Sequence, residues 1–140
     1  MNLPKKLTEL ANGLNGIKSY AGLVFNTEMI PGETDVLVVT IEDREEFPVY
    51  ITVDESQILC ITHVWKEVEI IPEKRIELLE TLLMMNLPMP LSSFSKLGHQ
   101  YLIFGALSTH SSLEELIEEI DVLSDNTLIA IEELRDYFIK

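Results

Sequence analysis

The sequence contains a single cysteine and three histidines. One cysteine cannot form an intramolecular disulfide or a cysteine-rich metal site, and this usage favours a reducing compartment. The histidines, His63, His99 and His110, are not spaced as metal ligands on one helix or strand, and no HExxH motif or Cys/His cluster occurs. We therefore expect no bound metal.

Positive charge is also scarce, because ten Lys and Arg residues stand against 24 Asp and Glu residues, which gives a formal net charge of −14. Such a chain repels phosphate backbones and anionic lipid headgroups, so we do not expect nucleic acid as a partner. No apolar run approaches the roughly 18 residues of a membrane span, and the N-terminus has no secretory apolar core. We expect a cytoplasmic protein without direct membrane insertion, built as a single domain over residues 1–140.

Recognisable catalytic motifs are absent, since the chain has no glycine-rich phosphate loop, no GxSxG and no GxGxxG. Three pairs of adjacent glutamates occur, Glu114-Glu115, Glu118-Glu119 and Glu132-Glu133. Paired-carboxylate catalysis needs two carboxyls that converge on one bond, whereas neighbours on a helix diverge. We interpret these pairs as the solvated side of a helix, and we expect no catalytic residue, no cofactor and no enzymatic activity.

The apolar pattern predicts a helix near the N-terminus, over residues 3–17. Three segments rich in β-branched and aromatic residues predict strands: DVLVVTIE from Asp35, FPVYITV from Phe47 and QILCITHVW from Gln57. Their connections are too short for a parallel crossover, so we expect an antiparallel meander. Residues 19–34 contain Pro31 and Gly32 and are predicted as a turn or loop, although the stretch GLVF could begin a strand.

The third of these strands carries the single thiol. Alternation predicts two faces, with Ile58, Cys60 and Val64 on one and Leu59, Ile61, His63 and Trp65 on the other. An apolar environment raises the pKa of a thiol, so we expect Cys60 to be structural and unreactive. We expect His63 to be a partly buried structural residue.

A second helix is predicted from Pro72, with the sequence PEKRIELLETLLMMNL, because proline suits the first helical position. Its apolar residues cover an arc of about 200°, which is wider than one packing face requires. We therefore predict that the helix contacts two surfaces and that the second is a dimer or partner interface. The predicted interface residues are Leu78, Leu82, Met85 and Met89. The alternative, that both surfaces belong to the core of one chain, stays open.

Two prolines follow this helix. Pro88 and Pro90 disfavour helical geometry at the preceding residues, so we expect an extended segment that runs at a sheet edge or into a strand. A hairpin with its turn at Gly98-His99 comes next, and then a long helix with Ser111 as N-cap and Glu114 completing a capping box. The predicted fold class is α+β, an antiparallel sheet with packed helices in the order α-β-β-β-α-β-β-α.

This order in a small acidic chain resembles the type III secretion chaperone-like fold, which YbjN-like bacterial proteins share. Three stretches look like the YjfI-like family of uncharacterised bacterial proteins: QILCITHVW from Gln57, NLPMPLSSFSKLGHQYLIFGALS from Asn86 and SLEELIEEIDVLSDN from Ser112. The resemblance implies no catalytic residues. Secretion chaperones with this fold are homodimers that hold an unfolded segment of a client, and YbjN-like proteins are described as regulators. YjfI-like proteins are thought to be encoded near a relative of a phage-shock protein, which implies a link to envelope stress.

Composition and resemblance together favour a non-enzymatic adaptor or chaperone-like protein. We expect a homodimer that binds another polypeptide of unidentified sequence. The alternative is a small-ligand-binding regulatory protein with a pocket between sheet and helices. An enzyme remains a third alternative, because active sites can be assembled from residues remote in sequence. A pocket with converging polar groups would favour the ligand-binding or enzymatic alternatives, and an exposed apolar groove would favour the adaptor.

Overall fold

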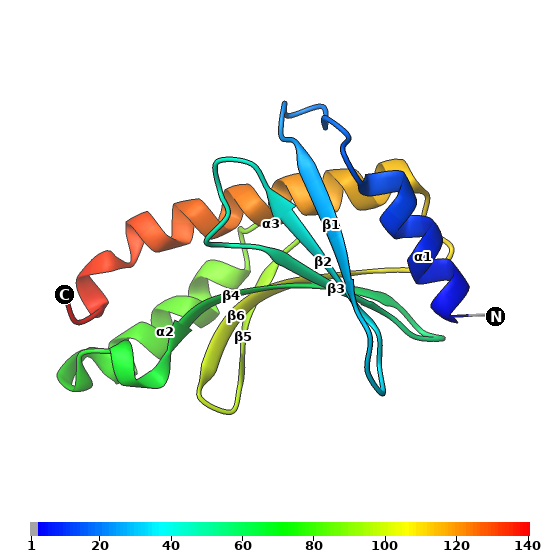
Figure 1. Cartoon of the computed structure of the whole chain (residues 1–140). Helices are drawn as coiled ribbons and strands as arrows, with labels where there is room; N and C mark the ends of the chain where they lie inside the picture. Colours follow the sequence, from blue (N-terminus) through cyan, green and yellow to red (C-terminus); the bar gives the residue numbers. More distant parts are fainter. Residues whose placement is uncertain (1–2) are drawn as a thin grey trace.

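The structure, a computed structural model, describes residues 3–140 and contains one six-stranded sheet with three α-helices (Figure 1). The helices are α1 (Leu3–Leu14), α2 (Arg75–Asn86) and α3 (Leu113–Glu133). The strands are β1 (Phe25–Ile30), β2 (Val36–Ile41), β3 (Val49–Val53), β4 (Ile58–Lys66), β5 (Ser93–Leu97) and β6 (Gln100–Leu107). Two short 3-10 helices, η1 (Glu67–Glu69) and η2 (Pro72–Lys74), precede α2, and a third, η3 (Arg135–Tyr137), follows α3.

The sheet has the strand order β1-β2-β3-β4-β6-β5, and every neighbouring pair is antiparallel. The α+β class, the central meander and the β5–β6 hairpin with its turn at Gly98-His99 confirm the sequence prediction. The predicted element order lacks one strand, β1, which lies in the segment assigned to a loop. Its sequence, FNTEMI, has few β-branched residues, and its strand geometry comes from pairing with β2 along its whole length.

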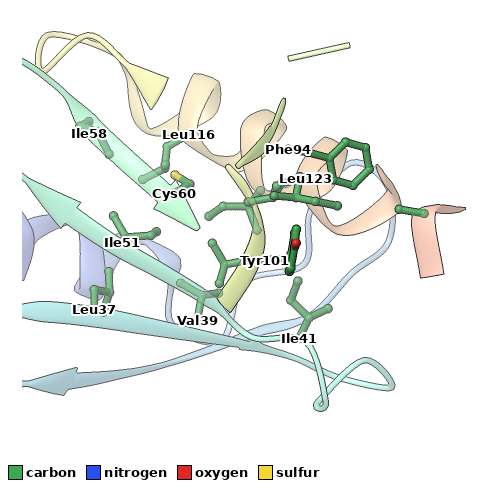
Figure 2. Close-up of a cluster of buried hydrophobic side chains, with 14 of the residues drawn as sticks. Leu37, Val39, Ile41, Ile51, Ile58, Cys60, Phe94, Tyr101, Leu116 and Leu123 are labelled. Atoms are coloured by element: carbon green, nitrogen blue, oxygen red, sulfur yellow. The ribbon is translucent and has the colours of Figure 1, made fainter. Parts of the chain in front are cut away.

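All three helices pack on the same face of the sheet, and the core lies between them and that face (Figure 1). Alternate strand residues such as Leu37, Val39 and Ile51 point inward, where α3 adds Leu116 and Leu123 (Figure 2). The helix α1 contributes Leu7, Leu10 and Leu14 to the same cluster. Burial of each large apolar side chain contributes about 2 kcal/mol, so this one-sided core carries most of the stability.

The alternation of β4 breaks near its end, where the pairing with β6 shifts register between His63 and Lys66. The prediction that Trp65 shares a face with His63 is therefore wrong, because a bulge changes the parity of the strand. Trp65 turns into the core and stacks on Phe138, with ring centroids 4.4 Å apart. His63 is exposed and stacks on Tyr50 at 5.1 Å, so it is not the partly buried residue that we expected.

The segment between α2 and β5 bends, so the predicted extended conformation is wrong. Leu87 keeps right-handed helical angles, and Leu91 has a positive φ of 61°. The side chain of Asn126 on α3 donates hydrogen bonds to the carbonyl of Pro90 at 2.9 Å and to Ser92 Oγ at 3.0 Å. These contacts hold the bend against α3. The segment does lead into β5, an edge strand, as the prolines indicate.

The helix α3 begins one residue later than predicted. Ser112 is the N-cap and accepts a hydrogen bond from the amide of Glu115, whose side chain accepts one from the amide of Ser112. The sequence contains two overlapping Ser-x-x-Glu patterns, and local capping alone cannot choose between them.

Glu119 contradicts the interpretation of the glutamate pairs as uniformly solvated. It lies three residues after Leu116 and four before Leu123, on the buried face of α3, and only 2% of it is exposed. Its Oε1 atom has no hydrogen-bond partner among residues 3–140 and approaches Gly105, where an added Cβ would lie only 1.8 Å from it. Burial raises the pKa of Glu119 to about 7, with a further contribution from the charge of Glu118.

Burial also raises the pKa of the Cys60 thiol, in agreement with the structural role that we predicted.

We predict that Glu119 makes folding less favourable as pH rises. A carboxyl whose pKa is about 7 in the folded state and about 4.5 when unfolded favours the folded state below pH 4.5. This contribution is lost between pH 4.5 and 7. The variant Glu119→Gln should therefore be about 1–3 kcal/mol more stable than the wild type at pH 8 and should lose this advantage near pH 4.5. Urea unfolding at several pH values measures the difference.

An exposed glutamate of the same helix provides the control, since Glu114→Gln should leave the pH profile almost unchanged. Parallel profiles for the wild type and Glu119→Gln would show that Glu119 is ionised at little cost in the folded protein.

Candidate functional site

An open groove of about 300 Å³ lies between α2 and the edge strand β5, and we call it the α2–β5 groove. Its lining residues are Leu79, Leu82, Leu83 and Asn86 from α2, Phe94, Ser95 and Lys96 from β5, and Tyr101 from β6. Most of these side chains are apolar, and Lys96 is the one lining residue with a formal charge. The groove lies on the sheet face that carries the helices, because the side chains of Phe94 and Tyr101 belong to the core cluster.

The predicted interface residues divide into two groups. Leu78 and Leu82 are 0% and 6% exposed and belong to the core of the single chain. The prediction that they lie on a second, outward surface of the helix is therefore wrong. Met85 and Met89 are half-buried and line a smaller depression of about 250 Å³ between the end of α2 and α3. A role of these methionines in binding a partner stays a prediction.

The exposed apolar residues of α2 are the neighbours of those that we predicted. Ile76, Leu83 and Leu87 are 71%, 72% and 92% exposed, and with the half-buried Leu79 they follow helical spacing on one side of the helix. Because Leu79 and Leu83 line the groove, this stripe continues the groove along α2. The sequence correctly indicated an arc wider than one packing face. It could not tell which half of the arc faces the core.

A charged cluster stands at one end of the groove. The carboxylate of Glu67 accepts hydrogen bonds from Arg75 Nε at 3.1 Å, from Lys96 Nζ at 2.8 Å and from the Tyr101 hydroxyl at 3.0 Å. The hydrogen bonds from Arg75 and Lys96 are the main reason that the pKa of Glu67 falls to about 2. Two cations share one carboxylate, so the cluster retains one excess positive charge in a chain of net charge −14.

Sequence reasoning missed this cluster. Its members come from η1, α2, β5 and β6, and only the folded sheet brings them together. No fixed spacing could have found it.

The exposed edge of β5 is partly protected. In an antiparallel edge strand, alternate residues direct their backbone N–H and C=O groups away from the neighbouring strand. Phe94 is such a residue, and its N–H donates to Asn86 Oδ1 at 2.7 Å. Asn86 therefore closes one position at which an added strand could pair, and it leaves the side-chain groove beside it open.

The groove has the chemistry of a binding site for an apolar group with a nearby carboxylate.

Within residues 3–140, no group of three or more His, Cys, Asp and Glu side chains is arranged to hold a metal ion. None of the helices in the described part of the chain is both long and apolar enough to cross a membrane. The three histidines lie on separate elements or turns, and all are exposed.

Comparison with known proteins identifies relatives of this chain. Residues 4–138 match the profile of a family described as uncharacterized proteins conserved in bacteria (DUF2170). The crystal structure of YbjN from E. coli, for which a role in transcription regulation has been suggested, is similar in fold, with a TM-score of 0.64 and 11% sequence identity. The alignment covers 98% of this chain and 96% of YbjN. No curated protein matches the sequence. The expected YbjN-like fold is thus confirmed.

We predict opposite effects for two adjacent substitutions on α2. Leu82→Glu should destabilise the protein by about 3 kcal/mol or more, because it places a charge among core side chains. Leu83→Glu should change the free energy of unfolding by no more than about 0.5 kcal/mol, because Leu83 is exposed. Chemical denaturation of both variants measures the difference. Equal effects would show that the groove side of α2 is wrongly assigned.

Proposed function

This chain belongs to the bacterial DUF2170 family, and on that premise we propose that it is a non-enzymatic adaptor that binds another polypeptide in the α2–β5 groove. The observation that carries the proposal is an open apolar groove with a cationic cluster at its end. Binding there requires no catalytic group. The proposal includes a location in a reducing cytoplasm, which the single cysteine favours.

The shape of the groove favours a polypeptide over a small molecule. Small ligands are usually held in concave sites that enclose most of their surface. The α2–β5 groove is open, and the exposed side chains of Ile76, Leu83 and Leu87 extend it along the helix. A segment with several apolar side chains can cover this stripe, and burial of each contributes about 2 kcal/mol before the costs of association.

The charge at the end of the groove defines the occupant further. The excess positive charge of the cluster around Glu67 attracts a carboxylate, and Lys96 is both a member of the cluster and part of the groove lining. We infer that the bound segment carries large apolar side chains with acidic residues next to them. A basic segment would bring like charges together at this end, although the rest of the molecule attracts it.

A regulatory task is consistent with this mode of binding. The net charge of −14 disfavours direct contact with DNA, so an effect on transcription such as that suggested for YbjN would here pass through protein contacts. A chaperone-like role would use the same groove for an unfolded segment of a client. The connection with envelope stress, implied by the YjfI-like resemblance, is part of this proposal.

A pair of synthetic peptides tests the proposal. One has leucines at helical spacing followed by three glutamates, and the other has lysines in place of these glutamates. We expect the acidic peptide to bind the wild type more tightly, as measured by fluorescence anisotropy. Leu83→Glu and Lys96→Glu should each weaken its binding about tenfold or more, which corresponds to 1.4 kcal/mol. Met84→Glu is the matched control, because Met84 is 68% exposed but does not line the groove.

Tighter binding of the basic peptide, or equal effects of Leu83→Glu and Met84→Glu, would contradict the proposal. The small-ligand alternative predicts a different result, namely that decanoate binds in a Leu83-dependent manner while neither peptide binds. That outcome would replace the adaptor with a ligand-binding regulatory protein.

A further inference from the structure

Within residues 3–140, no helix covers the sheet face opposite α1, α2 and α3. Residues that alternate with the core positions of β2, β3, β4 and β6 point to this side, which we call the open face. They are Val36, Val38, Thr40, Tyr50, Thr52, Leu59, Ile61, His63, Lys66, Gln100, Leu102, Phe104 and Ala106. None of them is acidic, and Lys66 at the end of β4 is the one with a formal charge when His63 is neutral, although 24% of the whole chain is charged.

The pairing of the strands aligns apolar side chains across this face. Val38 pairs with Tyr50, Tyr50 with Ile61, and Ile61 with Phe104, so one row crosses four adjacent strands. These four residues are half-buried by their neighbours within the sheet and lie outside the core cluster. A row of large apolar residues that no helix covers is the usual mark of a contact surface.

Charge indicates which occupant suits the open face. Two copies of a chain with a net charge of −14 repel each other, and the repulsion is strongest where carboxylates would meet. The outer side of α2 carries Glu77 and Glu80, and the exposed side of α3 carries Glu114 and Glu118. The open face of the four inner strands has no carboxylate, so two copies can approach there without pairing like charges.

We propose that two copies of the chain pack open face against open face around a two-fold axis that runs parallel to the strands, between β3 and β4. Two sheets packed in this way lie about 10 Å apart. This axis places β1 of each copy over β5 of the other, where the exposed Glu28 lies over Ser93. An in-plane axis perpendicular to the strands would instead place β1 over β1 of the second copy. It would bring the two Glu28 side chains towards each other, which like-charge repulsion opposes.

The two-fold axis defines contacts that recur in both directions. Tyr50 lies over Ile61 of the second copy, and Val38 lies over Phe104 of the second copy. The α2–β5 groove is on the helix-bearing face of the sheet, so the dimer leaves both grooves open. The inference is independent of what the groove binds. It keeps the expected homodimer but moves the contact from α2 to the sheet.

Light scattering coupled to size-exclusion chromatography tests the inference. From about 10 to 200 µM we expect twice the chain mass of 16.0 kDa. Ala106→Glu and Tyr50→Ser should each raise the dissociation constant at least tenfold, whereas Leu83→Glu and Met84→Glu on α2 should leave it unchanged. Ala106 is exposed, so its substitution spares the fold, and thermal melts by circular dichroism check both open-face variants. Raising the salt concentration from 0.01 to 0.15 M, which shortens the screening length from about 30 Å to about 8 Å, should tighten the dimer.

A monomer at every concentration would overturn the inference. A dimer that persists in folded Ala106→Glu and Tyr50→Ser, or one that Leu83→Glu abolishes, would overturn it as well. Mixing the single variants Val38→Cys and Phe104→Cys with a bismaleimide crosslinker that spans about 10 Å, the separation of two packed sheets, should link two chains, a product that neither variant gives alone. Absence of this product in a dimer would rule out the proposed axis. Ala106→Glu should still bind the acidic peptide, because Ala106 does not line the α2–β5 groove. The dimer and the peptide site can therefore fail independently.

Discussion

The packing of all three helices on one face of a single sheet is the constraint on which the rest of the structure depends. It gives the chain one core, in which Leu14 from α1, Leu78 from α2 and Ile120 from α3 lie with the inward strand residues. It also leaves two apolar surfaces that no other part of residues 3–140 covers. One is the open face of the sheet, and the other is the side of α2 that extends past β5.

The distribution of charge separates the tasks of these two surfaces. The open face of the four inner strands carries no carboxylate and has one cation, Lys66, at the end of β4, while the groove ends at a cluster with one excess cation. An acidic copy of the same chain therefore suits the first surface, and an acidic segment of a different polypeptide suits the second. Since the surfaces lie on opposite faces of the sheet, occupation of one does not block the other, and a dimer would present two grooves.

The elements with strong periodicity could be predicted from the sequence. The β2–β4 meander follows from short connections and β-branched residues, and α3 follows from an apolar stripe of many residues. The strand β1 was not predicted because its conformation depends on pairing with β2. The inward direction of Trp65 was not predicted because it depends on a bulge in the pairing of β4 with β6. Glu119 was expected in solvent because Glu118-Glu119 is an acidic pair, but the helical spacing from Leu116 and Leu123 puts Glu119 on the buried face of α3. For the groove, the periodicity of α2 predicts a wide apolar arc but does not show which residues of the arc face the core.

The central claim is that the two surfaces bind different partners. Methyl NMR of the protein labelled at Ile, Leu and Val tests it most directly, because both surfaces carry such residues. Dilution of the free protein should shift the methyl signals of Val38, Ile61 and Leu102 on the open face. Addition of an acidic, leucine-containing peptide at fixed concentration should shift those of Leu79 and Leu83 in the groove. A shared set of shifted methyls in the two experiments, or dilution shifts confined to α2, would contradict the account.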